Sequence, residues 1–229
     1  LKLLPSYEMT QADIERERQE RELGIISPSE PLLRRPARHV MPEEINTKRV
    51  KHLIRRLYWV AYGQRRNSRQ GQQRRTLVGL AAPQIGEALR IVLIDTGVDS
   101  SRKKYGRLEC FINPEIVWRS RETDEGREGC FSTGQVWGLV RRPIAIKVRA
   151  FNTENEQFEC ILEGFSARIA CHEIDHLDGI RFPDRIRSDK KRHWVHTEEL
   201  NEYPKHVKHW PRVCNRERWD AVRGVTPIR

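Results

Sequence analysis

The sequence lacks the features that mark membrane proteins and disulfide-rich secreted proteins. No run of about 18 apolar residues occurs, so we expect no membrane-spanning segment and no membrane partner. The five cysteines are an odd number without paired spacing, which favours a reducing compartment over a disulfide framework. Internal repeats are also missing. Hydrophobic residues form 37% of the chain, which is low but sufficient for a core.

The first half of the chain predicts two very different helices. A length of 229 residues suits one domain with extensions. Residues 10–23 predict a charged helix with Thr10 as N-cap, and its lack of an apolar stripe predicts a frayed or surface position. The second helix is strongly amphipathic. Its apolar residues are Val50, Leu53, Ile54, Leu57 and Val60.

Several segments have the alternating pattern of strands. Strands are predicted at 89–95 and 109–118. Apolar and charged residues alternate over 144–150, a turn is predicted at 152–156, and a return strand covers 158–162. This hairpin leads directly into a further helix. The pattern predicts an α+β fold with small mixed or antiparallel sheets packed around that central helix.

The central helix carries His172-Glu173-Ile174-Asp175-His176, which has the pattern H-E-x-x-H. Residues at i and i+4 share one helix face, so both imidazoles can bind one metal ion, with Glu173 beside a water molecule. Alone, the pattern fits a solvated charged helix face equally well. Apolar neighbours favour a buried helix that ends near Gly179. These neighbours are Phe165, Ile169, Ala170, Ile174 and Leu177.

Two further segments supply candidate partners for these histidines. Cys130 lies in Glu128-Gly129-Cys130-Phe131-Ser132 and is a candidate third ligand, since a catalytic metal needs three protein ligands and one open position. Cysteine with two histidines suits zinc or iron(II). The alternative for Cys130 is a small buried hydrophobe. Gln84, in Gly79-Leu80-Ala81-Ala82-Pro83-Gln84-Ile85-Gly86, offers an amide donor, and the alternative there is an ordinary loop.

In this order the three segments resemble the signatures of the peptide deformylase family. Those signatures are G-Φ-G-Φ-A-A-x-Q, E-G-C-Φ-S and H-E-x-D-H, where Φ is apolar. Weaker similarity begins at Gly24, passes through Pro31 to Ala37 and through Asn113-Pro114-Glu115-Ile116, and reaches about residue 186. The expected organisation is therefore an N-terminal extension (1–23), a catalytic domain (24–186) and a basic C-terminal extension (187–229).

The resemblance implies a role for each matching residue. Cys130, His172 and His176 would bind one divalent metal, with Fe²⁺ expected and Zn²⁺, Ni²⁺ or Co²⁺ as substitutes. Glu173 would act as general base and acid, and the Gln84 amide with the Phe131 backbone N–H would stabilise the oxyanion. Substrate contacts would come from four residues beside these signatures, namely Val78, Gly79, Leu80 and Gly129.

The implied reaction removes the formyl group from N-terminal formyl-methionine of nascent polypeptides and releases formate. The implied protein is a monomer of the bacterial cytoplasm. Because the chain begins with Leu1 rather than methionine, a cleaved transit peptide and a location in a mitochondrion or plastid stay open.

The sequence departs from the family pattern at three places. Leu77 replaces the first glycine of the first signature, beside the expected substrate cleft. Cys171 stands where glutamine is frequent, and a neighbour on a helix points about 100° away, so it should not replace Cys130. Residues 64–75 resemble an Arg-rich insertion loop.

Positive charge gathers in two segments. Residues 64–75 carry +5 and residues 185–229 carry +6, which together account for the net charge of +11. Contact with ribosomal RNA phosphates is one interpretation, and a solvated loop and tail is the other. The candidate contacts are Arg74, Arg75, Lys190, Lys191 and Arg192. Trp194, Trp210 and Trp219 would stack on bases or pack on the core.

Two alternative functions remain. One is a ribosome-associated relative without enzyme activity, in which Leu77 blocks the cleft. The other is a zinc peptidase whose third ligand is Glu198 or Glu199. A comparison of the hydrolysis of formylated, acetylated and unblocked peptides distinguishes these two functions from a deformylase.

Overall fold

The computed structural model describes residues 7–62, 77–101 and 106–225, which form two compact units. Each unit is built from segments that are distant in the sequence. The five-stranded unit consists of Arg35–Asp124 and Arg142–Gly179. The three-stranded unit consists of Leu1–Arg34, Glu125–Arg141 and Ile180–Arg229.

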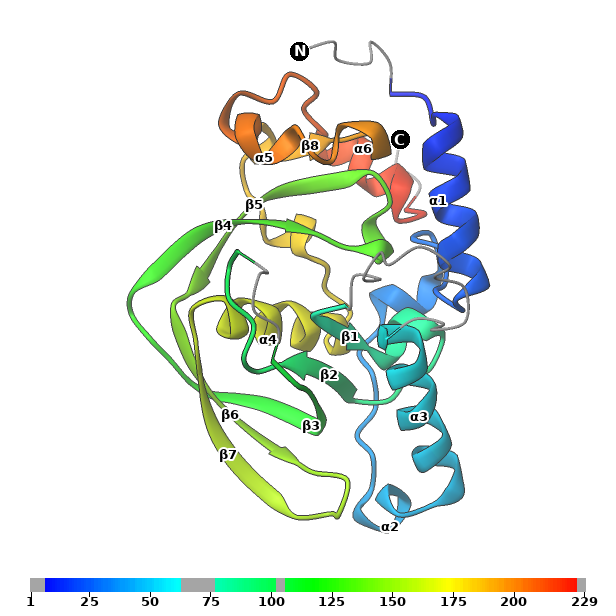
Figure 1. Cartoon of the computed structure of the whole chain (residues 1–229), viewed down its shortest axis with the longest axis vertical. Helices are drawn as coiled ribbons and strands as arrows, with labels where there is room; N and C mark the ends of the chain where they lie inside the picture. Colours follow the sequence, from blue (N-terminus) through cyan, green and yellow to red (C-terminus); the bar gives the residue numbers. More distant parts are fainter. Residues whose placement is uncertain (1–6, 63–76, 102–105, 226–229) are drawn as a thin grey trace, which may run out of the picture. The chain divides into compact units, whose positions relative to one another are not determined.

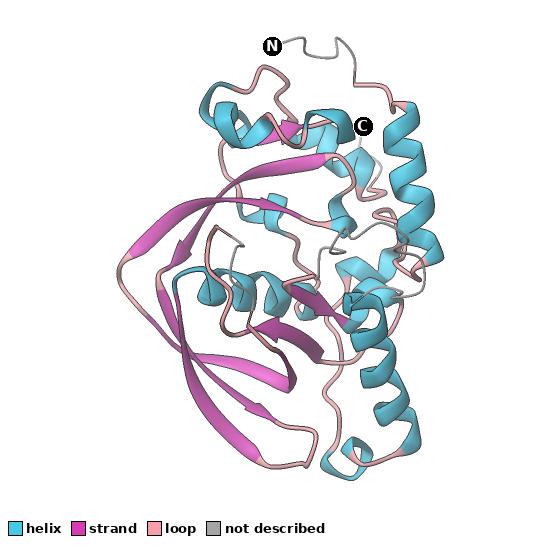
Figure 2. Ribbon diagram, viewed as in Figure 1, coloured by secondary structure: helices cyan, strands magenta, loops and turns pink. Residues whose placement is uncertain are grey.

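The five-stranded unit contains one antiparallel sheet with the order β1-β2-β3-β6-β7. Its strands are β1 (Gly79–Ala81), β2 (Ile91–Asp95), β3 (Leu108–Arg119), β6 (Ala145–Phe151) and β7 (Gln157–Glu163). All four predicted strands, including the 144–162 hairpin, are confirmed. Figure 2 shows β3, β6 and β7 as long twisted ribbons.

Helix α4 (Gly164–Leu177) follows β7 directly and runs alongside β1 and β2 (Figure 1). Its apolar face packs into the main core with residues of the sheet, among them Phe111 and Val148. Helix α3 (Lys48–Tyr62) confirms the second predicted helix and buries all five predicted apolar residues. A short helix, α2 (Pro42–Ile45), precedes it.

The three-stranded unit has the sheet order β4-β5-β8. Its strands are β4 (Thr123–Gly129), β5 (Val136–Pro143) and β8 (Arg192–Trp194). The helices of this unit are α1 (Gln11–Glu22), α5 (Tyr203–His206) and α6 (Arg216–Val222). Short 3₁₀ turns complete the connections. They are η1 (Pro31–Arg34), η4 (Phe131–Thr133), η5 (Phe182–Arg185), η6 (Asp189–Lys191), η7 (Thr197–Glu199) and η8 (Val207–His209), with η3 (Ala82–Ile85) in the other unit.

The three C-terminal tryptophans are packed rather than exposed. Trp219 and Trp194 lie in one buried cluster with Val136 and Cys214, and Trp210 lies in a second with Tyr203. The segment after residue 186 therefore belongs to a folded unit, together with residues near the start of the chain. The assignment of residues 24–186 as the catalytic domain stays a prediction.

Helix α1 begins as predicted, with Thr10 as N-cap and a reciprocal bond between Thr10 and Asp13. The helix is formed rather than frayed and lies at the surface, which confirms the second of the two predicted alternatives, and the residues it buries, Asp13 and Glu20, are polar rather than apolar. Asp13 is fully buried and bonds to His196 Nδ1 at 2.6 Å and to the Thr197 N–H at 2.7 Å. A search for apolar stripes cannot find such an anchor.

None of the helices in the described part of the chain combines the length and apolar content that crossing a bilayer requires.

Candidate active site

Helix α4 presents the two histidines one turn apart. The imidazole centroids of His172 and His176 lie 5.1 Å apart, with their ring planes inclined at 75°. Ser166, in the first turn, donates to the backbone oxygen of Asp95 and so ties α4 to the end of β2. The helix ends at Leu177, as the predicted cap at Gly179 implies.

The two acids of the motif have different surroundings. Asp175 forms a buried ion pair with Arg142, with 2.6 Å between Nη1 and Oδ2. This pairing offsets the cost of burying both charges and fixes the middle of α4. Glu173 is also buried, but it lies against Gly79 of β1. Asp175 therefore serves structure, while Glu173 faces the neighbouring strand.

Gly79 allows a very close approach to Glu173. A Cβ atom at this position would lie 2.5 Å from Glu173 Oε1 and 2.8 Å from Ile169 Cγ2. The neighbouring Val78 uses its carbonyl to accept the Asp95 N–H. The Leu80 side chain is fully buried, so only its backbone remains for the predicted contact with substrate. The first signature thus sets the distance between β1 and α4.

Gln84 is buried in η3 and its orientation is fixed. Its side-chain oxygen accepts the backbone N–H of Ala81 at 2.8 Å. The other end of this amide is the Nε2 group, which is a hydrogen-bond donor. This orientation supports the predicted role of Gln84 as an amide donor.

Cys130 stands between β4 and η4, where the backbone turns sharply. Its carbonyl accepts both the N–H and the hydroxyl of Thr133, at 3.2 and 2.8 Å. Phe131 is the first residue of η4, and the first N–H groups of a helix have no partner within it. A Cβ on the preceding Gly129 would lie 2.3 Å from the Trp137 ring, so Gly129 is needed for packing.

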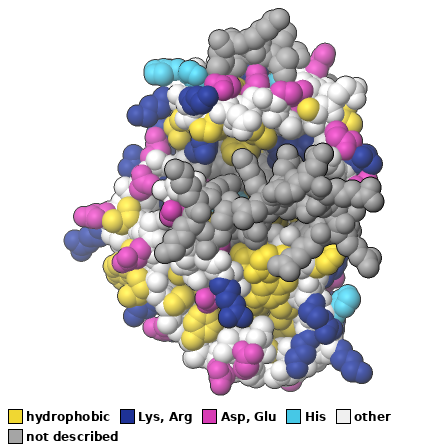
Figure 3. All heavy atoms as spheres, viewed as in Figure 1, with side chains coloured by type: hydrophobic (Ala, Val, Ile, Leu, Met, Phe, Trp, Pro, Cys, Tyr) yellow, Lys and Arg dark blue, Asp and Glu magenta, His cyan; other side chains and the backbone are white. Residues whose placement is uncertain are grey.

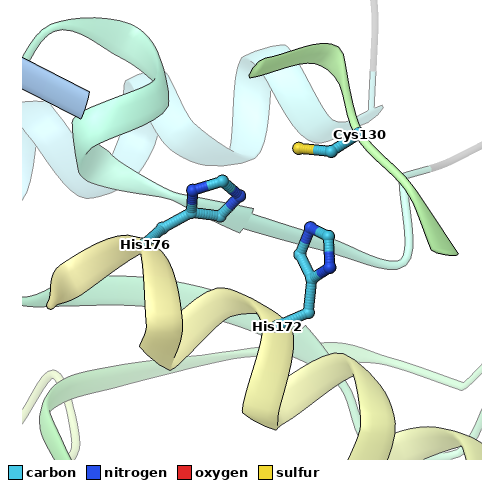
Figure 4. Close-up of side chains that lie close together, drawn as sticks. All are labelled: Cys130, His172 and His176. Carbon is cyan, nitrogen blue, oxygen red and sulfur yellow. The ribbon is translucent and has the colours of Figure 1, made fainter. Parts of the chain in front are cut away.

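The structure brings Cys130, His172 and His176 together. Their ligand atoms all lie within 4.8 Å of one another, and the thiol and both imidazoles turn toward a common point (Figure 4). One thiol and two imidazoles are a donor set that suits zinc or iron(II). The three side chains therefore fit a divalent metal, and among the described residues they are the group found to do so.

Comparison with known proteins identifies the family. The sequence model of the polypeptide deformylase family matches residues 23–192. This chain belongs to the polypeptide deformylase family. Peptide deformylases are metal-dependent hydrolases that act in the N-terminal processing of new proteins.

Individual relatives agree with this assignment. The chain is 44% identical over 115 residues to the peptide deformylase of Desulforudis audaxviator, covering 50% of this chain and 70% of that protein. It is 45% identical over 109 residues to peptide deformylase 1 of Bacillus subtilis, covering 48% and 64%. The aligned part thus spans about two thirds of the length of these relatives.

Solved deformylases share the fold. A crystal structure of the class I type b peptide deformylase from Acinetobacter baumannii has a TM-score of 0.62 and 31% identity, covering 71% of this chain and 98% of that one. The Thermotoga maritima enzyme has a TM-score of 0.59 and 33% identity, covering 72% and 97%.

The structure describes two of the three departures from the deformylase pattern. Leu77 is half-buried two residues before Gly79, and its N–H donates to Ala61. Cys171 packs in the main apolar core. The insertion at 64–75 lies outside the described residues.

The alternative ligands of a zinc peptidase have other partners. Glu199 is buried in an ion pair with Arg212, and Glu198 accepts the hydroxyl of Thr10. Neither glutamate belongs to the group that could hold a metal. The geometry therefore favours the deformylase ligand set.

The predicted ribosome contacts divide into three cases. Arg74 and Arg75 lie outside the described residues. Lys190 is exposed, and Lys191 pairs with Glu125. Arg192 is 2% exposed and donates to the carbonyls of Ile186 and Cys214. Arg192 is therefore a structural residue, and naming it a surface contact was wrong.

Sequence reasoning missed Arg181, which supports the Cys130 segment. Its Nη1 donates to the carbonyls of Ser132 and Pro28, at 2.8 and 2.6 Å, and its guanidinium lies over the Trp219 ring. Burial lowers the pKa of Arg181 to about 10, so it remains a cation near neutral pH. Its position within Gly-Ile-Arg-Phe-Pro gives no local signal of this role.

Proposed function

We propose that this protein removes the formyl group from the N-terminal formyl-methionine of nascent polypeptides, releasing formate and a free amino terminus. The observation that carries the proposal is the convergence of Cys130, His172 and His176, with Glu173 on the same helix. Family membership supplies the reaction class. A solved structure of the Acinetobacter baumannii enzyme holds Met-Ala-Ser, the peptide that such a reaction would leave.

The cation would be held by Cys130, His172 and His176, with Fe²⁺ expected and Zn²⁺, Ni²⁺ or Co²⁺ as substitutes. When bound, it supplies a Lewis acid that activates water and polarises the formyl oxygen. A thiolate and two neutral imidazoles leave the site with net positive charge. That charge favours the developing oxyanion.

Glu173 would move the protons of the reaction. Its carboxylate takes a proton from the attacking water and returns it to the nitrogen of the departing amine. Burial beside Gly79 limits the positions that this carboxylate can take. A base held in one place in this way needs little reorganisation during proton transfer.

Two donors would stabilise the tetrahedral oxyanion. One is Nε2 of Gln84, whose oxygen is held by the Ala81 N–H. The other is the N–H of Phe131 at the start of η4. One such donor lowers the barrier by roughly 3 kcal/mol. Gly79, the first residue of β1, and the preceding Val78 would present backbone groups to the peptide.

The decisive experiment compares three peptides with the metal-loaded protein. Formyl-Met-Ala-Ser should yield formate and Met-Ala-Ser, whereas acetyl-Met-Ala-Ser and unblocked Met-Ala-Ser should remain intact. Cleavage of an internal peptide bond would instead favour a zinc peptidase. Stable metal binding without turnover of any peptide would favour a relative without enzyme activity.

We further propose that the protein is a cytoplasmic monomer that meets its substrate at the ribosome. The exposed Lys190 and the partly exposed Lys191 support a phosphate contact beside η6. Replacing both with alanine should weaken ribosome binding at low salt and spare hydrolysis of the free formyl peptide. Equal binding by this variant would show that the segment is only a solvated surface.

A further inference from the structure

The outward face of α3 carries positive charge without any acid. The helix contains five Lys and Arg residues and no Asp or Glu. Its apolar face is buried in the five-stranded unit, so the cations occupy the opposite side. The exposed basic residues are Lys48, Arg49, Lys51, His52 and Arg55.

Two aromatic side chains continue this face toward the end of the helix. Trp59 and Tyr62 are 45% and 42% exposed, which is unusual for side chains of this size. Tyr62 stacks on Tyr58, with ring centroids 6.0 Å apart and planes 9° from parallel. The hydroxyl of Tyr58 donates to the Leu108 carbonyl, which holds the stack in place.

Helical geometry aligns the charges with the aromatic rings. Steps of three or four residues place Lys48, Lys51, Arg55, Trp59 and Tyr62 along one side of α3. The resulting strip, which we call the α3 strip, has cations at one end and aromatic rings at the other. Figure 3 shows Lys and Arg side chains gathered over this helix.

Few carboxylates lie near the α3 strip. Glu87 lies 3.9 Å from both Arg49 and Arg56, which belong to α3 but not to the strip. Within the described ranges, neither Lys51 nor Arg55 forms an ion pair. A solvated helix face usually mixes both signs of charge, whereas this one holds a single sign beside exposed rings.

We propose that the α3 strip binds single-stranded RNA. Lys51 and Arg55 contact phosphates, and Trp59 and Tyr62 stack on successive unpaired bases. Charge complementarity favours this polyanion over a protein partner, and two rings offer too little apolar area for a membrane surface. The source of the RNA rests on the proposed function, since an enzyme acting on nascent chains works beside exposed ribosomal RNA.

The test measures fluorescence anisotropy of a labelled, unstructured RNA of about twelve nucleotides, a length that spans a typical site. Lys51→Ala with Arg55→Ala should reduce the log–log salt slope by about 1.4, or about 0.7 for each lost phosphate contact. Trp59→Leu should weaken binding about 5- to 150-fold and leave that slope unchanged. The segment 64–75 is present in every variant, so the differences report α3 alone.

Matched controls come from the same unit. Trp118 on β3 is 51% exposed, so Trp118→Leu removes an equally exposed indole and should leave RNA binding intact. Lys147→Ala with Arg149→Ala removes two charges that are paired with Glu159. This pair should retain the salt slope of the original protein.

Two results would overturn the proposal. One is an equal loss of RNA affinity in the α3 variants and the controls. The other is binding to phosphatidylserine vesicles that depends on Trp59 while RNA binding does not. Hydrolysis of formyl-Met-Ala-Ser is measured in parallel. RNA binding without hydrolysis would contradict only the proposed activity, and hydrolysis without RNA binding would contradict only the α3 strip.

Discussion

Gly79 and Glu173 lie so close together that no side chain fits between them. A Cβ on Gly79 would come within 2.5 Å of Glu173 Oε1 and 2.8 Å of Glu173 Cγ. The absence of a side chain on β1 therefore decides where the carboxylate on α4 can lie. Gly79 in the first signature therefore helps to position Glu173 in the third signature.

Replacing Gly79 with alanine should displace the Glu173 carboxylate. A displacement of about 1 Å can reduce the rate about 100-fold, so kcat should fall by that order while the metal is retained. The measurement is steady-state hydrolysis of formyl-Met-Ala-Ser, with metal content determined by elemental analysis. If Gly79 serves only to present its backbone to the peptide, KM should rise instead and kcat should stay unchanged.

Replacing Cys130 with alanine should remove most of the bound metal. The variant leaves two imidazoles, and loss of a third ligand from a three-ligand site weakens binding strongly. Cys171→Ala is the matched control, because Cys171 packs in the apolar core beside the same histidine. The control should keep a full complement of metal. Stoichiometric metal in the Cys130 variant would refute the ligand assignment.

Glu173→Gln should keep the metal and lose activity. The amide has nearly the same shape but cannot accept the proton of the attacking water, so the rate should fall at least about 100-fold. The assay is single-turnover deformylation with a metal determination on the same sample. Near-normal turnover by the loaded variant would exclude Glu173 as the proton carrier.

The sequence predicts features that depend on residues close together in the chain better than features that depend on residues far apart in it. The hairpin before α4 and the spacing of His172 and His176 follow from local periodicity, and the structure confirms both elements. Cys130 lies more than forty residues away from His172. Only the ordered set of family signatures connected it to the histidines.

Other features were not predictable because their partners are remote. The burial of Asp13 depends on His196, 183 residues later. Arg181 is bound by carbonyl groups, which every residue has and no sequence pattern marks. The net charge of a long segment does not reveal the positive charge of α3, because it adds the cations of the helix to the acids of neighbouring segments.

Leu77→Gly tests whether the departure in the first signature narrows the substrate cleft. Leu77 is half-buried two residues before Gly79. Removing its side chain should raise activity or broaden tolerance at the formylated residue. The measurement compares kcat/KM for formyl-Met, formyl-Leu and formyl-Phe peptides. Unchanged values across all three would show that Leu77 does not limit access.

The last prediction concerns the buried pair of Asp13 and His196. Burial alone would raise the pKa of Asp13, but hydrogen bonds from His196, Thr10 and Thr197 outweigh it and lower the pKa below its ordinary value of 3.8. The unfolded chain therefore binds a proton more readily than the folded one near this pH. The resulting stability is present above about pH 4 and is lost as the pH falls further.

Asp13→Asn removes the charge that these donors serve, so it should lower the free energy of unfolding by about 1.5–3 kcal/mol near neutral pH. It should also flatten the decline in stability below about pH 4, because the group that titrates there is gone. Urea unfolding at a series of pH values measures both effects. The matched control is Glu22→Gln at the exposed end of α1, where Glu22 pairs with Arg18 at the surface and should contribute little. Equal pH profiles for the Asp13 variant and the original protein would show that the buried carboxylate does not anchor α1.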